Sequence, residues 1–317
     1  MHRYKILDIY RGMAALFVFF YHIRYQINLV DVFENFWIFT DFFFVLSGFI
    51  ISYNYKFIHN INDFFSFIKK RFLRIYPLHF IITIIFLLKY VIIDDQLEIT
   101  SFLNNIFLLN SIHYDYINLY NQPSWSISAE FIIYIFFAFY LFISTKFNLK
   151  IILALFIVVL FVSLTFILNQ SISETNNLAF IRCGVSFFYG LSVELFFREK
   201  KSITSLLIFF IFFIFFGLFF KLSTYYIIIY FFGIIIHITK HFEIRNTYVI
   251  RFLHLLGSIS YSLYMLQSIL IYIFVVAFGS KWQISHFIFI LITLIITSYI
   301  SYNVIENKLT QKLKKLL

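Results

Sequence analysis

Six ionisable side chains lie inside long apolar stretches of this 317-residue chain, where a charge is costly to bury and by default suggests a functional site. They are Arg11, His22, Asp41, Glu130, Arg182 and Glu194. An imidazole near a carboxylate has a pKa that its surroundings can tune around neutrality, which suits a general base. These residue types therefore favour general-base chemistry.

The first apolar stretch carries Arg11 and His22, eleven residues apart. On a helix this separation is three turns plus about 20°, so both side chains face the same way, about 16 Å apart along the axis. One helix face then presents a cation near one end and an imidazole near the other. The alternative is that Arg11 extends its charge to the membrane surface and that His22 is a hydrogen-bonded core histidine.

Four of the six residues are expected at a similar depth on four different helices: His22, Asp41, Glu130 and Arg182. Each would be costly to bury alone, whereas together they can neutralise one another around a cavity. One interpretation is a functional cluster in which His22 is the general base. The other is a network of ion pairs that only stabilises the fold.

A second cluster consists of basic residues that precede Tyr76 and Pro77. Its members are Lys69, Lys70, Arg71 and Arg74. Arg71 and Arg74 are three residues apart and share a helix face, so two guanidiniums can bind one polyanionic ligand such as a phosphate. The alternative is a basic cytoplasmic loop with no ligand.

The segment Gln122–Glu130 opens another apolar stretch. Trp125 suits the membrane interface, and Ser126 and Glu130 lie one helical turn apart on one face. A Ser-His-Asp triad would need Ser126 or Ser128, but no G-x-S-x-G elbow is present, which argues against a serine nucleophile. The single cysteine, Cys183, excludes an internal disulfide and a cysteine metal cluster, and we expect no metal site.

The composition indicates that membrane helices position these residues. Hydrophobic residues make up 62% of the chain and charged residues only 13%, against about a quarter charged in soluble proteins. This excludes a soluble enzyme, a disordered chain and a nucleic-acid binder. Two prolines and eight glycines favour long helices over a barrel.

Stretches of about 20 apolar residues predict an all-α, polytopic helical bundle with about ten transmembrane helices. The predicted spans are 6–26, 36–53, 76–93, 126–143, 151–168, 178–197, 203–220, 224–239, 254–278 and 285–305. Residues 99–120 are less apolar and are expected to form an interfacial or re-entrant segment, with eleven spans as the alternative. Arg11 interrupts the first span, so this span is not a cleavable signal peptide.

Most of the 25 Lys and Arg residues fall on alternate connections, which predicts that both termini are cytoplasmic. The tail, 308–317, alternates Leu with Lys and is expected on the inner membrane surface. We expect a single membrane domain over 1–317, with no appended soluble domain.

Five stretches, in order, resemble motifs of the membrane acyltransferase-3 family, which are bacterial multi-span O-acyltransferases of surface polysaccharides. They are Leu7-Asp8 with Arg11-Gly12 and His22, DFFFVLSGFIIS at 41–52, RFLRIYP at 71–77, WSISAEFIIY at 125–134, and GSISYSLYMLQ at 257–267. The resemblance covers most of the chain. Gln267 stands where the family often has a histidine, so no catalytic histidine is carried over there.

The resemblance implies O-acylation, most often acetylation, with cytoplasmic acetyl-CoA or another acyl-CoA as donor substrate and no bound cofactor. The acceptor would be a glycan or lipid-linked oligosaccharide of the cell envelope, such as an O-antigen or capsule. Membrane lipids of the bacterial inner (plasma) membrane would surround the protein, and no nucleic acid would bind. Arg71 and Arg74 would bind the CoA phosphates, and Arg11 would line the path of the donor arm.

The resemblance also implies roles for the residues of the cluster. His22 would be the general base or a transient acyl carrier, and Asp41 or Glu130 would orient its imidazole. Trp125 and Ser126 would belong to the acceptor pocket, where Trp125 could stack on a sugar. Arg182 would stabilise an oxyanion or pair with Glu130.

Two other functions suit a polytopic chain with charges in its spans. One is a transporter or flippase of lipid-linked or acylated glycans, but the chain shows no paired inverted repeats with broken helices and has only two prolines. A transferase consumes acetyl-CoA and releases free thiol, which a transporter does not. The other is a structural subunit of a glycan assembly complex, in which Arg71→Ala and Arg74→Ala would have no effect.

Overall fold

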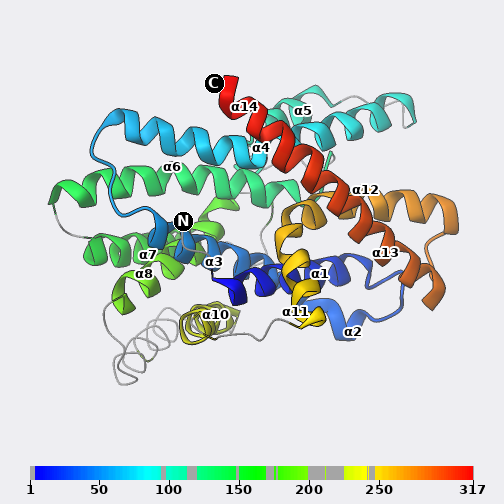
Figure 1. Ribbon diagram of the computed structural model, residues 1–317, viewed down its shortest axis with the longest axis horizontal. Helices are drawn as coiled ribbons and strands as arrows, with labels where there is room; N and C mark the ends of the chain where they lie inside the picture. The colour runs from blue at the N-terminus through cyan, green and yellow to red at the C-terminus, as the bar shows by residue number, and fades with distance from the viewer. Residues whose placement is uncertain are drawn as a thin grey trace.

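The computed structural model describes residues 4–93, 98–112, 120–147, 150–168, 175, 178–198, 211, 225–240, 242 and 247–316. Within these ranges every regular element is a helix, so the predicted all-α class is confirmed (Figure 1). The elements are α1 (Lys5–Ile23), α2 (Val30–Phe33), η1 (Glu34–Ile38), α3 (Phe39–Asn54), α4 (Ile61–Ile92), α5 (Ile99–Ile106), α6 (Ser124–Phe147), α7 (Lys150–Ile167), α8 (Phe180–Phe197), α10 (Tyr225–Thr239), α11 (Tyr248–Ser258), α12 (Ser260–Phe278), α13 (Ile284–Ser301), the π-helical η2 (Tyr302–Leu309) and α14 (Thr310–Leu316).

Among the described residues, seven helical segments are long and apolar enough to cross a membrane. They are Lys5–Ile23, Val30–Asn54, Ile61–Ile92, Ser124–Phe147, Phe180–Phe197, Ser260–Phe278 and Ile284–Leu316. Two shorter apolar helices, Lys150–Thr165 and Tyr225–Thr239, match two further predicted spans. The predicted span 203–220 lies, apart from residue 211, outside the described residues. The chain is therefore polytopic, and the number of ten spans stays a prediction.

Helix α4 begins at Ile61, well before the predicted start of the third span at residue 76. The Asn60 side chain caps the helix by accepting a hydrogen bond from the Asp63 amide at 2.8 Å. The helix then continues through Pro77, which removes one backbone donor. Near Pro77, the Tyr261 hydroxyl on α12 donates a hydrogen bond to the Ile75 carbonyl of α4 at 2.5 Å. The helix therefore extends well beyond the N-terminal end of the predicted span 76–93.

The single span predicted over 254–278 is divided into α11 and α12. At the break, the Ser258 hydroxyl donates to the His254 carbonyl at 3.0 Å and the Ser260 hydroxyl donates to the Gly257 carbonyl at 2.9 Å. Serine hydroxyls that bond nearby carbonyls compete with helix continuation. Gly257 also lets α11 approach α1 closely, since a Cβ there would collide with the Asp8 carbonyl.

The segment 99–120 forms the short helix α5 and, as far as residue 112, a loop that carries buried polar side chains. Asn110 donates to the Ser124 hydroxyl at 2.8 Å, and Ser124 donates to the Asn105 side chain at 2.9 Å. The Ser128 hydroxyl donates to the Leu108 carbonyl at 2.6 Å. Non-helical backbone at membrane depth needs such partners inside the protein. This arrangement favours the re-entrant alternative over the interfacial one.

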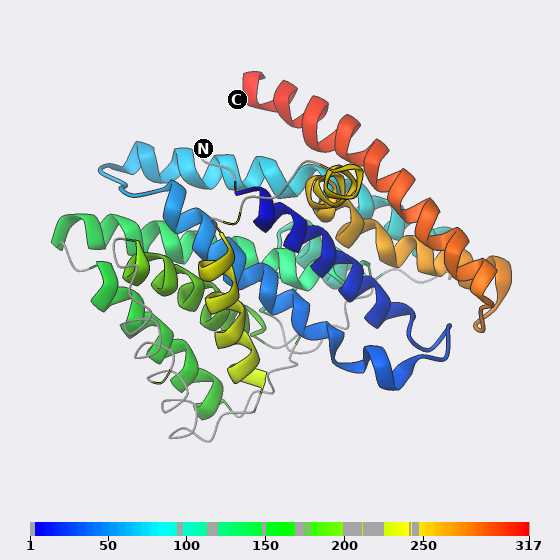
Figure 2. The same ribbon diagram turned by 60° about the horizontal axis from the view of Figure 1, so that its bottom comes forward.

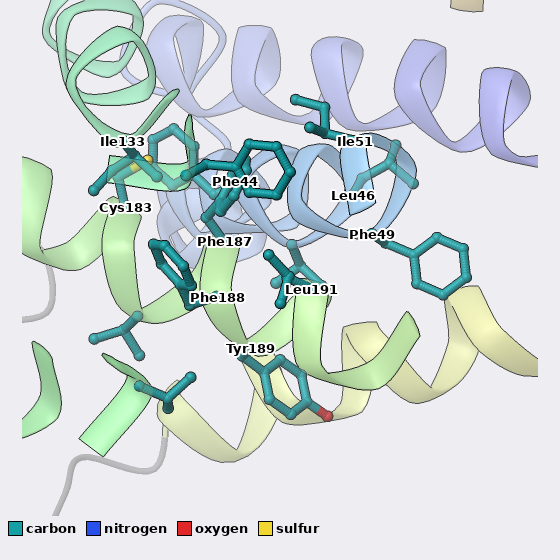
Figure 3. Packing of buried hydrophobic residues seen from close by; sticks show 14 of the residues in the cluster. Phe44, Leu46, Phe49, Ile51, Ile133, Cys183, Phe187, Phe188, Tyr189 and Leu191 are labelled. Carbon is teal, nitrogen blue, oxygen red and sulfur yellow. The ribbon is translucent and has the colours of Figure 1, made fainter. Parts of the chain in front are cut away.

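Helices α3 and α8 form the most extensive helix contact of the bundle. Two glycines permit it, because a Cβ at Gly48 would meet the Phe187 carbonyl and a Cβ at Gly190 would meet the Val45 carbonyl. Figure 3 shows the buried side chains at this contact, with Tyr189 pointing away toward α10. The Tyr189 hydroxyl donates to the Tyr230 carbonyl at 2.5 Å, which joins α10 to the pair.

The C-terminal segment α13–η2–α14 forms one long rod that crosses α12 (Figures 1 and 2). Tyr4, near the start of the chain, and Lys314, near its end, line the same cavity. The two ends of the chain therefore lie on the same side of the bundle, and the cytoplasmic location of that side stays a prediction.

Candidate active site

Three cavities follow one another through the bundle. We call them the arginine cavity (about 480 Å³), the central cavity (about 110 Å³) and the histidine cavity (about 400 Å³). Arg11, Ile50, Arg71 and Arg74 line both of the first two cavities. Thr40 and Tyr264 line both the central and the histidine cavity. The shared walls place the three cavities in series along one path.

The arginine cavity has an excess of cationic side chains. Arg11, Lys70, Arg71, Arg74 and Lys314 line it, against the acidic side chains of Asp8 and Glu306. Arg71 is buried and fixed, because it donates to the Tyr55 hydroxyl at 3.0 Å and its guanidinium lies 5.1 Å from the centre of that ring. Arg74 is exposed. Two guanidiniums beside open space suit a ligand with several negatively charged oxygens, such as phosphates.

Arg11 lies where the arginine cavity meets the central cavity, on the helix that also carries His22. It is partly buried and forms no ion pair with any of the described residues. The sequence expectation that one face of α1 presents both Arg11 and His22 agrees with this placement, because each lines a different section of the same path.

The central cavity is the smallest of the three and mostly apolar, with one carboxylate in its lining. Glu130 accepts hydrogen bonds from the Ser47 and Tyr134 hydroxyls, both at 2.6 Å and both on the same carboxylate oxygen. Ser126, predicted to share a face with Glu130, also lines this cavity. Its hydroxyl donates to the Tyr264 hydroxyl at 2.8 Å.

The histidine cavity contains His22 beside Trp37, Trp125 and Arg182. Within the described part of the chain no residue forms a hydrogen bond with the His22 imidazole, and the ring contacts Tyr21 edge-on at a centroid distance of 5.2 Å. The imidazole nitrogens of His22 can therefore form hydrogen bonds with a ligand that enters the cavity. Trp125 is only 6% exposed and packs against Phe44, so most of its ring is covered.

Asp41 pairs with Arg182 and not with His22. Arg182 donates to both carboxylate oxygens, with the closest contact at 2.6 Å, and Ser186 adds a hydrogen bond at 3.1 Å. The guanidinium also lies 4.9 Å and 5.1 Å from the ring centres of Trp37 and Trp125. The sequence predicted these charges at one depth, and the packing of α3 on α8 decides that two of them neutralise each other.

Glu130 and Arg182, which the sequence offered as an alternative pair, face different cavities. The sixth buried charge, Glu194, accepts from Arg198 at 2.6 Å and from Ser52 at 3.0 Å, away from the three cavities. The described residues hold no group of three His, Cys, Asp or Glu side chains arranged for a metal ion.

Sequence reasoning gave no role to three residues of the path. Tyr264 and Thr40 form the wall between the central and histidine cavities. Glu306 lies in the π-helical η2, lines the arginine cavity and accepts a hydrogen bond from Ser262 at 2.5 Å. A π-helical turn often marks a functional site, but an apolar sequence pattern does not reveal one.

Comparisons with known proteins indicate the class of reaction that this path serves. Among curated proteins, and among solved structures, nothing matches the chain. A family model described as "Acyltransferase domain" matches residues 4–303, which is nearly the whole chain. The residues that carry the resemblance noted in the sequence all fall within this match, and so do Arg11, His22 and the walls of the central and histidine cavities. The chain therefore belongs to the membrane acyltransferase-3 family, whose members transfer acyl groups.

Proposed function

We propose that this acyltransferase is an O-acetyltransferase of the bacterial inner (plasma) membrane. It moves an acyl group from cytoplasmic acetyl-CoA to a sugar hydroxyl of a cell-envelope polysaccharide such as an O-antigen or capsule. The observation that carries the proposal is the series of three cavities, which connects a group of arginines to an imidazole with open space beside it. A donor held by its phosphates at one end of the path presents its acyl group toward the other end.

Donor binding uses the arginine cavity. Arg71, fixed by Tyr55, and the exposed Arg74 bind the CoA phosphates through charge-assisted hydrogen bonds. Arg11 stands at the entrance to the central cavity, where the thioester arm of the donor passes. Glu130 lines the next section of the arm's path, held by Ser47 and Tyr134.

Acyl transfer takes place in the histidine cavity. The sugar oxygen attacks the thioester carbonyl while the His22 imidazole accepts the hydroxyl proton, and the C–S bond then breaks. The proton passes to the sulfur, so CoA leaves as a free thiol. Arg182 stabilises the oxyanion of the tetrahedral intermediate, and Asp41 holds the guanidinium in place.

The alternative chemistry keeps His22 as a transient acyl carrier, in which the imidazole attacks the thioester first. The acceptor is then acylated in a second step, after CoA has left. Trapping a labelled acyl group on the protein in the absence of acceptor distinguishes the two routes.

The test is a comparison of wild-type cells with cells that carry His22→Ala at matched protein level. Mass spectrometry of the surface glycan should show an alkali-labile acyl increment only in the wild type, and membranes should release free thiol from acetyl-CoA only in the wild type. His254→Ala is the control, because His254 lies on α11 and lines none of the three cavities.

An acyl increment that persists in His22→Ala would contradict the proposed role. Equal glycan masses in both strains, with less glycan reaching the surface in the variant, would indicate a transporter instead.

A further inference from the structure

The cavity between the arginine and histidine cavities has the smallest volume of the three. The central cavity has about 110 Å³, against about 480 Å³ and 400 Å³ for its neighbours. Its far wall, shared with the histidine cavity, is made by Thr40 and Tyr264. A group that travels from the arginines to His22 through these cavities passes the Thr40 and Tyr264 side chains.

This wall is held from three helices. Ser126, on α6, donates a hydrogen bond to the Tyr264 hydroxyl on α12 at 2.8 Å, and the two residues are only 3% and 6% exposed. Phe43, on α3, packs edge-on against the Tyr264 ring at a centroid distance of 5.9 Å. The Ser126 hydroxyl oxygen also lies 2.9 Å from the Pro123 carbonyl, so its single proton is shared between two acceptors, which fixes the position of the side chain. The ring is therefore restrained at its hydroxyl end and along its side.

We infer that Ser126 and Tyr264 form a size filter that restricts the donor to short acyl groups. The inference rests on the proposed function, since it takes acyl-CoA as the donor. In such a donor the acyl group is the end most distant from the phosphates, so it is the first part to reach the filter. Each additional methylene in a filled apolar site costs roughly 10-fold or more in transfer rate.

The experiment compares acetyl-CoA with hexanoyl-CoA, using purified protein in lipid vesicles with its glycan acceptor. Free thiol and the acylated acceptor are both measured, and the result is the hexanoyl-to-acetyl rate ratio. We expect the wild-type ratio to be below about 1:100. Tyr264→Ala removes the ring and should raise the ratio at least about 10-fold, and Ser126→Ala, which only loosens the ring, should raise it less.

Two further variants separate a filter from other roles. Tyr264→Phe keeps the ring and should keep the low ratio. Tyr272→Ala removes a tyrosine from the same helix that lines none of the three cavities, and should leave both rates unchanged. Equal wild-type rates with the two donors, or an unchanged ratio in both Tyr264→Ala and Ser126→Ala, would overturn the inference. If the wild type releases no thiol even from acetyl-CoA, the proposed function itself has failed.

Discussion

The Asp41 carboxylate and the Arg182 guanidinium form the most enclosed charge pair among the described residues, with side-chain exposures of 0% and 4%. Their hydrogen bonds, with Ser186 as a further donor, compensate much of the cost of removing both charges from water. Losing one member leaves the other charged and enclosed, which is far more costly than losing both.

Asp41→Asn should therefore lower the free energy of unfolding by about 3–5 kcal/mol. The measurement is the unfolding temperature of the protein purified in detergent. Asp63→Asn is the control, because Asp63 lies at an exposed helix start, and its unfolding temperature should hardly change. The double variant Asp41→Leu/Arg182→Met should recover part of the loss, and a further loss in the double variant would contradict this account.

Arg74→Ala should weaken donor binding without affecting the fold, because the Arg74 side chain is exposed. A hydrogen bond to a charged group contributes about 1.5–3 kcal/mol, so the KM for acetyl-CoA should rise roughly 10-fold to 100-fold. Lys69→Ala removes a charge from the same helix outside the three cavities and should have little effect on KM. Equal KM values for the two variants would show that only the general positive charge matters.

The sequence predicted which residues are enclosed better than it predicted their partners. Counting along each span placed His22, Asp41, Glu130 and Arg182 at one depth. The structure places His22 and Arg182, with its partner Asp41, at the histidine cavity, and Glu130 at the central cavity. Whether Asp41 meets His22 or Arg182 depends on the rotation of each helix and on its neighbour. The partner of Asp41 is decided by the contact between α3 and α8. The apolar pattern of one helix does not predict that contact.

Among the helices, the contact of α3 with α8 depends on glycines that lie against backbone carbonyls. A Cβ at Gly48 would collide with the Phe187 carbonyl, which is fixed in its helix, whereas a Cβ at Gly184 would meet the ring of Phe161. A side chain can rotate away from a new methyl group more readily than a helix backbone can move. The two sites therefore differ in how much overpacking they tolerate.

Gly48→Ala should lower the unfolding temperature more than Gly184→Ala does. Overpacking costs about 1–3 kcal/mol, and we expect Gly48→Ala at the upper end of this range or above it. Both unfolding temperatures are measured in the same detergent. A larger effect at Gly184 would show that α3 and α8 can move apart easily.

The boundaries of helices were harder to predict than their existence. The third span was predicted to start at residue 76, but α4 begins after its cap at Asn60 and continues through Pro77, so Arg71 and Arg74 lie on the same helix as the predicted span. The late apolar stretch looked continuous, yet serine hydroxyls and the close approach of Gly257 to α1 divide it. Both features depend on contacts between helices that are distant in the sequence.

For the whole molecule, the three cavities should work as one path. Ser47→Leu introduces a large side chain into the central cavity, so CoA should still bind in the arginine cavity while acyl transfer falls by at least about 10-fold. CoA binding is measured by calorimetry and transfer by thiol release. Ser47→Ala is the matched control, since it removes the same hydrogen bond to Glu130 without filling the cavity. Equal transfer by the two variants would show that the donor takes another route.

The wall between the central and histidine cavities also bears on the movement of protons through the protein. A path lined by arginines, a carboxylate and a histidine would let protons leak down their gradient if water filled it from end to end. Phe43 and Phe44 line the central cavity, and their rings offer a water molecule no hydrogen bond. This apolar section opposes a continuous chain of water molecules between the arginines and His22, so the protein can provide a path for an acyl group without providing one for protons.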